Sequence, residues 1–451
     1  MMLYPVVLVH VQRQTNKIGF PIGLGVMVNT LKKHDIEVRV LDMVPYEVEE
    51  REKIFKSSIS SEPAIYGFGV MIGSNHLDEV EKYAALIRQA SPASIIVYGG
   101  HFPSSIPELM LQHCSCDYVV HGEGERTFPA LIQAIREGDA APESITGVFC
   151  RRNGQIVGRR NHRLGKLTEL STPDFSLFNM DYYMQYLHET GQSWELMASR
   201  GCAGKCVFCY KTYGSGISLR PVNYVLDEID YIIKNFDLRR FYFVDENFLQ
   251  IKKYFREFIA EKNKRGLEFT FIAQARLDAV DEEMCEVASR NGLVCISTGI
   301  ESVSQKTLDY MKKKQNVGVA ETKIKLMRQY GIRPMVNFIM GFPTDTEEDY
   351  VQIADFVRQN SLQKLTRISF LTPLPSTVLF QEVVEKGLIK DIFDYCHKLD
   401  NLFWQRHINL TNMPDEVLDY HFKRITELGR RDLFEVKSPE YAKQIRTERF
   451  I

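Results

Sequence analysis

The amino-acid sequence predicts an α/β protein made of two successive α/β domains and a helical C-terminal segment. Short apolar runs alternate with amphipathic stretches of helix length in two separate regions, which is the rhythm of parallel βα units. Runs such as YGFGV and SIIVYGG are apolar on both faces, as in parallel strands covered by helices. The length of 451 residues exceeds one ordinary domain. We expect domains at 1–145 and 191–380, a linker with a hairpin at 146–190, and a C-terminal helical cap at 381–451.

The first region has the pattern of a doubly wound, Rossmann-like domain. Its expected strands are Val6–Val11, Val38–Leu41, Ile65–Met71, Ile95–Tyr98 and Tyr118–Val120, and its expected helices are Gly23–Lys33, Leu77–Gln89 and Thr127–Glu137. Ligand crevices in such sheets open at the carboxyl ends of the strands. The loops there, Gly69–His76, Gly99–Ser105 and His121–Glu125, are rich in small residues that let a bulky ligand approach the backbone.

The second region predicts a partial (β/α)6 barrel. It follows a hairpin that turns at Asn153–Gly154 and a linker, expected to be irregular, with aromatic residues up to Tyr186. The expected strands are Trp194–Ser199, Arg240–Val244, Thr270–Ala273, Val294–Thr298, Pro334–Met340 and Arg367–Leu371, and the expected helices are Val225–Asn235, Lys252–Arg265, Asp281–Asn291, Val319–Tyr330 and Glu347–Gln359. In such barrels the chemistry lies at the carboxyl ends of the strands. From about Phe380 we expect a helical cap across the barrel mouth.

Composition excludes several classes of protein. The net charge of −2 gives no overall electrostatic preference for nucleic acid or an anionic membrane. No apolar run approaches the roughly 20 residues that span a bilayer, and the N-terminal residues lack the features of a signal peptide. We therefore expect a cytoplasmic protein. Nine cysteines are few for a disulfide scaffold; most are expected to be buried thiols, and the pair Cys114 and Cys116 is only a weak metal-binding signal.

Three cysteines share one loop, RGCAGKCVFCYKTYG, with the spacing C-x3-C-x2-C. Thiolate sulfur is the soft, anionic ligand that iron–sulfur clusters prefer, and the small residues around the first cysteine let the backbone fold tightly. Cys202, Cys206 and Cys209 therefore predict a [4Fe–4S] cluster with one iron left unligated by the protein. The alternative is a zinc knuckle, but this normally needs a fourth Cys or His nearby, and the nearest downstream histidine is His397.

The cysteine loop resembles the signature of the radical S-adenosylmethionine (radical SAM) enzymes, because an aromatic residue flanks the third cysteine on each side. Downstream, FYFVDENF, FIAQARLD, STGIES, NFIMGFP and LTPLPST are similar, in order, to motifs of the class B subfamily. The resemblance implies that the open iron chelates SAM, whose reductive cleavage gives a 5′-deoxyadenosyl radical. It assigns to SAM the residues Tyr210, Asp245, Glu246, Gln274, Arg276, Gly299, Glu301, Asn337 and Gly341. For Arg276 a surface ion pair is the alternative. Asp227 and Glu228 lie at a helix start, where carboxylates favour the dipole, and receive no chemical role.

About the first 140 residues resemble the cobalamin-binding domain that precedes the radical SAM core in class B enzymes, in the segments PIGLGVMVNTLKKHDIEVRVLDM, VYGGHFPSS and CDYVVHGEGERTF. The residues implied for cobalamin are Gly73, Ser74, Asn75, His76, Gly99, Gly100, His101, Gly122, Glu123 and Gly124. No D-x-H-x-x-G motif occurs, so the histidine that binds cobalt in many B12 enzymes is absent. His76 is either a cobalt ligand or a residue at a helix start. The alternative for the whole domain is a Rossmann-like module that has lost its cofactor.

The resemblance implies a cobalamin-dependent radical SAM enzyme that methylates an unactivated carbon of a small-molecule, lipid or natural-product substrate. It also implies an external electron donor of the flavodoxin or ferredoxin type. Cyclisation, rearrangement or oxidation without methyl transfer stays open, as do methylthiotransfer with a second cluster and a non-catalytic carrier. Candidate substrate contacts in NLFWQRHINLT are Trp404, Arg406 and His407, for which packing is the alternative.

Overall fold

The chain folds into two compact α/β units, each assembled from separate stretches of sequence. Our computed structural model describes residues 4–11, 18–73, 75–139, 141–161, 167, 172–211, 216–401 and 405–429. Unit 1 consists of Met1–Tyr183, Tyr210–Gly214 and Leu374–Phe403, and unit 2 of Met184–Cys209, Ser215–Pro373 and Trp404–Ile451. None of the described helices is both long and apolar enough to cross a bilayer.

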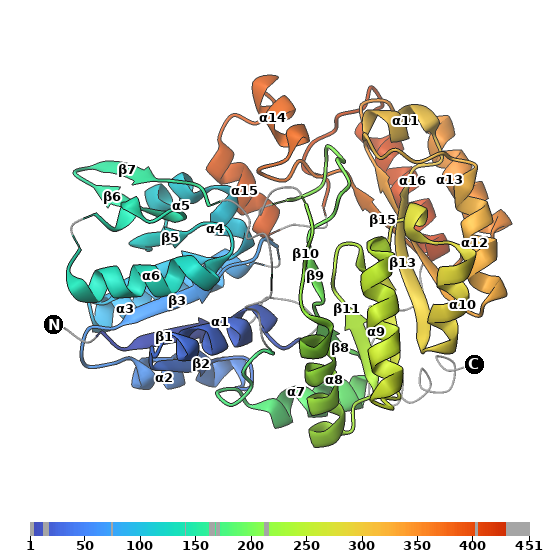
Figure 1. The fold of residues 1–451 in the computed structure, drawn as a ribbon. Coiled ribbons are helices and arrows are strands. Elements are labelled where there is room, and N and C mark those ends of the chain that lie inside the picture. The colour runs from blue at the N-terminus through green and yellow to red at the C-terminus, as the bar shows by residue number, and fades with distance from the viewer. Residues whose placement is uncertain are drawn as a thin grey trace. The chain divides into compact units, whose positions relative to one another are not determined.

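Unit 1 contains a seven-stranded sheet in the order β2-β1-β3-β4-β5-β6-β7 (Figure 1). Its strands are β1 (Val6–His10), β2 (Val38–Asp42), β3 (Ile65–Gly69), β4 (Ile95–Gly99), β5 (Tyr118–Val120), β6 (Val148–Arg152) and β7 (Gln155–Gly158). The first five are parallel, so the order 2-1-3-4-5 is that of a doubly wound sheet with its switch point between β1 and β3. The expected Rossmann-like architecture is confirmed.

The helices of unit 1 follow the predicted alternation with three additions. They are α1 (Ile22–Lys33), α2 (Val48–Ser58), α3 (His76–Ala90), α4 (His101–Ser105), α5 (Pro107–His113) and α6 (Gly124–Glu137). Helices α2, α4 and α5 were not predicted. In α2 only Phe55 is buried, so this helix lacks the apolar stripe by which amphipathic helices are recognised.

The linker region contains a confirmed hairpin and one wrong prediction. Strands β6 and β7 are antiparallel, and Asn153 and Gly154 between them have φ values of 49° and 76°, the left-handed backbone of a tight hairpin turn. The aromatic segment expected to be irregular instead forms helix α7 (Met180–Thr190). Its residues Tyr183, Met184 and Leu187 are buried at helical spacing.

Unit 2 contains six parallel strands that lie side by side in chain order, as a partial (β/α)6 barrel requires. The strands are β8 (Trp194–Leu196), β11 (Arg240–Phe243), β12 (Thr270–Gln274), β13 (Leu293–Glu301), β14 (Arg333–Met340) and β15 (Thr366–Phe370); the helices are α8 (Val222–Phe236), α9 (Lys252–Lys264), α10 (Glu282–Arg290), α11 (Gln305–Tyr310), α12 (Val319–Gln329) and α13 (Glu347–Gln359). Alternate residues such as Phe243, Phe271 and Phe338 are fully buried on one face of the sheet. The predicted barrel strands and helices are confirmed.

The C-terminal segment, expected as one cap over 381–451, is divided between the two units. Helices α14 (Val378–Glu385) and α15 (Ile392–Asn401) belong to unit 1, whereas α16 (Asp415–Gly429) belongs to unit 2. In α15 the buried carboxylate of Asp400 accepts hydrogen bonds from the backbone N–H groups of Gly73 (2.6 Å) and Leu77 (2.8 Å) at the start of α3. In α16 the ring of Phe422 stacks on Phe370 of β15 at a centroid distance of 4.0 Å.

Candidate metal centre and cofactor sites

The cysteine loop leaves the sheet of unit 2 after β8 and a short strand, β9 (Ser199–Arg200), which pairs with β10 (Ser218–Leu219). Gly201, with φ of 86°, turns the chain into the loop. Cys202, Cys206 and Cys209 are half-buried, whereas the other six cysteines are buried. The three predicted cluster ligands are therefore the cysteines that remain accessible.

Neighbouring strand ends hold the backbone of this loop in place. The N–H of Gly201 donates to Glu246 Oε2 at 2.8 Å. Gln250 bonds the loop twice, by donating to the carbonyl oxygen of Gly201 at 3.0 Å and accepting from the N–H of Ala203 at 3.3 Å. The N–H of Val207 donates to the carbonyl oxygen of Met311 at 3.0 Å. Gln250 was not among the predicted site residues, and its signal was its place just after the strand end DEN.

Asp245, predicted to face SAM, is directed at the backbone that enters the loop. It is fully buried and accepts hydrogen bonds from the N–H of Ala198 (3.0 Å) and the hydroxyl of Ser199 (2.5 Å). Burial raises its pKa from 3.8 to about 7, against the lowering effect of these hydrogen bonds. In this geometry Asp245 positions the chain between β8 and the cysteines.

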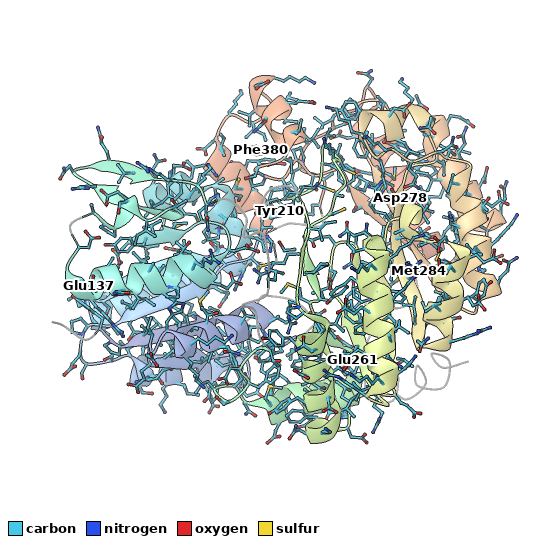
Figure 2. All side chains as sticks on the ribbon, in the orientation of Figure 1. Glu137, Tyr210, Glu261, Asp278, Met284 and Phe380 are labelled. Atoms are coloured by element: carbon cyan, nitrogen blue, oxygen red, sulfur yellow. The ribbon has the colours of Figure 1, made fainter. Side chains whose placement is uncertain are left out.

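The groups around Cys206 favour its thiolate form. The hydrogen bond from Cys209 lowers the pKa of Cys206, against the effect of burial, and the charges of Lys313 and Arg276 lower it further. Arg276 reaches Cys206 Sγ at 3.7 Å and donates to the carbonyl oxygen of Lys313 at 2.7 Å. It also pairs at 2.9 Å with Asp278, which is labelled in Figure 2. This ion pair was the alternative to the predicted role of Arg276 toward SAM.

The loop fits an iron–sulfur cluster better than a single ion. Within the described ranges, no three His, Cys, Asp or Glu side chains gather closely enough to hold one metal ion. Three accessible sulfurs beside cationic groups suit a larger anionic cluster.

A buried ion pair lies at the end of β13. Lys313 Nζ donates to Glu301 Oε1 at 2.7 Å, and the two side chains are 5% and 12% exposed. Glu301 has the unusual φ of 66°. A Cβ at Gly299 would lie 1.8 Å from Glu301 Oε1, so glycine is required for the Glu301 side chain to fold back over the strand. Lys313, hidden in a run of three lysines, was not predicted.

The other predicted SAM residues lie along the half-buried face of the same sheet. Asn337 is within 3.4 Å of Ser297 Oγ, and Gln274 and Ser297 are paired in register across β12 and β13. Arg367 is opposite Asn337 on β15 and is exposed; among the described residues its guanidinium has no hydrogen bond or ion pair. Gly341, with φ of 107°, begins the turn after β14.

The carboxyl edge of the unit 1 sheet gathers most of the residues predicted for cobalamin. The backbone of Gly100 passes close to Val70, the residue after β3, since a Cβ at Gly100 would lie 2.8 Å from the carbonyl oxygen of Val70. The N–H of Gly122 donates to Ser104 Oγ at 2.9 Å, and the hydroxyl of Tyr210 donates to the carbonyl oxygen of His101 at 2.6 Å. A Cβ at Gly99 would be 3.7 Å from its nearest atom. This edge of small residues fits a flat cofactor that approaches the backbone.

His76 and its neighbours build the start of α3. The ring of His76 is buried, and its Nδ1 accepts a hydrogen bond from the N–H of Met71 at 3.0 Å. Asn75 has a left-handed φ of 55°, and the N–H of Gly73 binds Asp400. These contacts favour the helix-start interpretation of His76 over cobalt ligation. Ser74 lies outside the described residues.

The remaining candidates have structural partners or lie outside the described chain. Glu123 is buried directly before α6, and Gly124 is the first residue of that helix. Arg406 pairs with Asp415 (2.8 Å) and Asp419 (3.1 Å) at the start of α16. His407 is half-buried nearby, and Trp404 lies outside the described residues.

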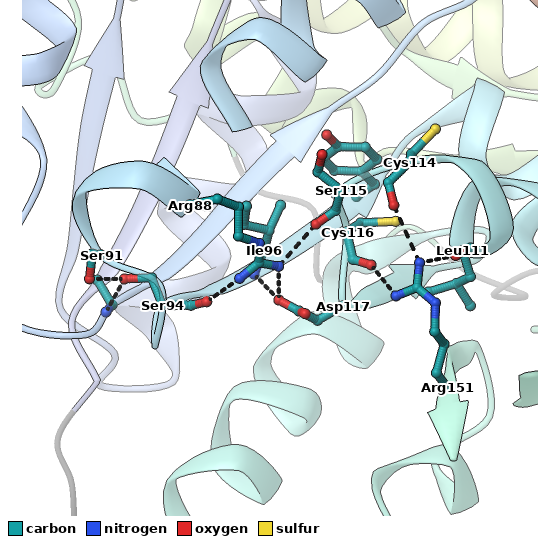
Figure 3. Close-up of polar contacts among 12 residues, drawn as sticks. Arg88, Ser91, Ser94, Ile96, Leu111, Cys114, Ser115, Cys116, Asp117 and Arg151 are labelled. Carbon is teal, nitrogen blue, oxygen red and sulfur yellow. Dashed lines mark hydrogen bonds and ion pairs between the residues drawn. The ribbon is translucent and has the colours of Figure 1, made fainter. Parts of the chain in front are cut away.

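The C-x-C pair serves the fold of unit 1 (Figure 3). Arg151 donates to the carbonyl oxygens of Cys114 (3.3 Å) and Cys116 (3.0 Å), and Arg88 donates to that of Ser115 (2.9 Å). Burial raises the pKa of both thiols well above the usual range. Protonated, buried thiols are poor metal ligands, which disfavours a second centre at this segment.

Two family models match separate parts of the chain, and known proteins are similar over most of its length. The family model of the B12 binding domain matches residues 11–132, and that of the radical SAM superfamily matches residues 196–357. An uncharacterized methyltransferase of Pyrococcus horikoshii is 25% identical over 84% of this chain and 82% of its own length. The anaerobic magnesium-protoporphyrin IX monomethyl ester cyclase of Rubrivivax gelatinosus is 25% identical over 70% of this chain, which spans 58% of that protein.

A solved structure shows the same fold over most of the chain. It is the radical SAM methyltransferase TsrM of Kitasatospora setae with cobalamin and a [4Fe–4S] cluster bound, with a TM-score of 0.73, 20% identity and coverage of 85% of this chain and 78% of TsrM. The cofactors implied by the two family models are a [4Fe–4S] cluster, SAM and cobalamin. The chain therefore contains a B12-binding domain followed by a radical SAM domain, which is the order of domains in the class B radical SAM enzymes.

Proposed function

We propose that this enzyme transfers a methyl group to an unactivated carbon of a small-molecule or lipid-like substrate. The observation that carries the proposal is the accessible cysteine loop at the carboxyl ends of a parallel sheet, in a chain that also has a B12-binding domain. A methyltransferase is similar over 84% of the chain. When bound, the cluster and SAM supply radical chemistry, and cobalamin supplies the methyl group.

We propose the following roles for residues of this chain. Cys202, Cys206 and Cys209 hold the cluster, while Arg276 and Lys313 favour the thiolate form of Cys206. Glu301, Asn337 and Gln274 offer polar groups to SAM along the open face of the sheet. The exposed guanidinium of Arg367 on the same face suits an anionic or polar group of the substrate. Because one rigid sheet would hold both SAM and the substrate, it would bring their reacting atoms close together.

The anaerobically reconstituted enzyme tests this function. We expect about four irons per chain, because the motifs provide one cluster, together with bound corrin detected by its absorbance. With SAM, a strong reductant and a panel of candidate substrates, methyl transfer gives S-adenosylhomocysteine, 5′-deoxyadenosine and a product heavier by one methylene. About eight irons would indicate a methylthiotransferase, and the absence of SAM cleavage under strong reduction would overturn the proposal in favour of a carrier.

Cyclisation or oxidation without methyl transfer is the second candidate. The similarity to the Rubrivivax gelatinosus cyclase favours it. In that case 5′-deoxyadenosine forms without S-adenosylhomocysteine. We place the enzyme in the cytoplasm, where reducing conditions keep the cysteines available as thiolates, and expect an external donor of the flavodoxin or ferredoxin type to reduce it.

A further inference from the structure

A basic cavity of about 300 Å³ lies against the cysteine loop in unit 2. One wall is Ala203–Lys205, the stretch between the first two cluster cysteines. The opposite wall is the turn of three consecutive lysines, Lys312, Lys313 and Lys314, and Arg276 lies between the walls. Asp278 is the carboxylate among the lining residues and is already paired with Arg276. The cavity therefore concentrates positive charge next to the ligands of the metal centre.

Three of these lysines present uncompensated charge. Lys205, Lys312 and Lys314 are exposed, and within the described part of the chain their ammonium groups have no hydrogen bond or ion pair. Lys234, elsewhere on unit 2, pairs with an acidic neighbour. Other exposed lysines of unit 2 that have no ion pair within the described residues, such as Lys253 and Lys364, lie outside this cavity. Like charges gathered on one surface repel one another and attract an oppositely charged partner.

The lysine turn is built to face outwards. Lys312 and Lys314 both have a φ of 54°, a left-handed conformation that is uncommon for residues other than glycine. The three lysine side chains alternate in direction. The ammonium of Lys313 points inwards to Glu301, whereas Lys312 and Lys314 are exposed. The carbonyl oxygen of Lys313 accepts a hydrogen bond from Arg276, and that of Met311 accepts one from Val207. The turn is thus tied directly to the cysteine loop.

We infer that Lys205, Lys312 and Lys314 form the docking surface for a small acidic protein that carries single electrons. This inference rests on the proposed function, which requires one-electron reduction of the cluster. The charge on the surface selects an acidic partner, and its position beside the cysteines gives that partner a short path to the metal. In the transfer the carrier is oxidised by one electron and the cluster is reduced by one, without the movement of an atom.

The test compares two charge-reversal variants with equal net charge. K312E/K314E removes two lysines of the docking surface. The control, K253E/K364E, removes two exposed lysines of unit 2 that lie outside the cavity and have no ion pair in the described residues. Lys364 has a left-handed φ of 67°, as Lys312 and Lys314 do at 54°, so the control matches the charge change at both positions and the backbone conformation at one of them. Iron and corrin content establish that each variant is folded.

The first measurement is binding of oxidised flavodoxin to the reconstituted enzyme, followed by the flavin signal at several salt concentrations. We expect K312E/K314E to weaken binding by about tenfold or more and to flatten its salt dependence, with the control within about twofold of wild type. Equal binding by the two variants would overturn the inference. So would displacement of flavodoxin by inorganic phosphate at matched ionic strength, because the cavity would then be a site for a small anion.

The second measurement separates docking from catalysis. 5′-Deoxyadenosine formation is driven either by reduced flavodoxin or by dithionite, which needs no docking surface. We expect K312E/K314E to be slower by about tenfold with flavodoxin and unchanged with dithionite. If dithionite gives no product in wild type, the proposed function has failed, and the binding measurement still decides the docking surface.

Discussion

The buried ion pair between Arg220 and Glu228 supports the strand that leads into the cysteine loop, and its removal has a predictable energetic consequence. Both side chains are 1% exposed. Arg220 donates two hydrogen bonds of 3.0 Å to Glu228 Oε2 and one of 2.6 Å to the carbonyl oxygen of Met197. Burial raises the pKa of Glu228, and the charge of Arg220 opposes this rise.

Arg220→Met leaves the carboxylate of Glu228 buried without its cation. We expect this to destabilise unit 2 by about 3–5 kcal/mol. The double variant R220M/E228L leaves no unpaired charge and loses the hydrogen bonds to the carbonyl of Met197 and from the indole of Trp194, worth about 1 kcal/mol each. We therefore expect the double variant to be more stable than R220M by at least about 1 kcal/mol.

Tryptophan fluorescence during urea unfolding measures this difference. The chain has two tryptophans, and Trp194 donates to Glu228 at 3.4 Å, so a Trp404→Phe background leaves a single reporter beside the ion pair. Iron content per chain, measured in parallel, shows whether the cysteine loop is retained. A cost of less than about 1 kcal/mol for R220M, or simple additivity in the double variant, would refute the reasoning.

Three further predictions follow from the site and its supports. Cys206→Ser should abolish cluster iron and 5′-deoxyadenosine release, whereas Cys116→Ser should leave both intact; iron analysis that finds no difference would contradict the assignment of the ligands. Because the pKa of Asp245 is raised from 3.8 to about 7, the folded state retains a proton that the unfolded state loses, so stability should fall by on the order of 4 kcal/mol as pH rises from about 4 to 7. Asp245→Asn should flatten this dependence in thermal unfolding, and an unchanged pH profile would count against it. Asp400→Ala should expose the amides at the start of α3 to faster hydrogen exchange, at a cost of about 1–3 kcal/mol; equal exchange would show that this contact is dispensable.

The elements of both sheets were predictable because their apolar periodicity is local. The strand at Ile95 and the helix at Glu347 were found within one residue of their observed bounds. Helix α7 was missed because Thr172–Pro173 and the aromatic residues after it suggested an irregular linker. Its burial comes from tertiary contacts: the hydroxyl of Tyr183 donates to Asp42 at 2.8 Å, a partner far away in the chain.

Site residues that belong to a sequence motif could be predicted, whereas those brought to the site only by the fold could not. The cysteine spacing identified the cluster ligands as candidates. Gln250 lies just after the strand end DEN and Lys313 in a run of three lysines, but both patterns usually indicate solvated surface. Only the order of strands in the sheet places Lys313 next to Glu301 and Gln250 next to Gly201.

The interleaving of the two units along the chain limits how this protein can be divided. A fragment that ends at residue 145 would lack Tyr183, which bonds Asp42, and Asp400, which caps α3. A fragment that ends at residue 380 would keep every strand of both sheets but lose that cap together with the Phe422–Phe370 stack. Neither half is a self-sufficient module, so exchange of halves between related enzymes by simple gene fusion would leave orphaned contacts on both sides of the junction.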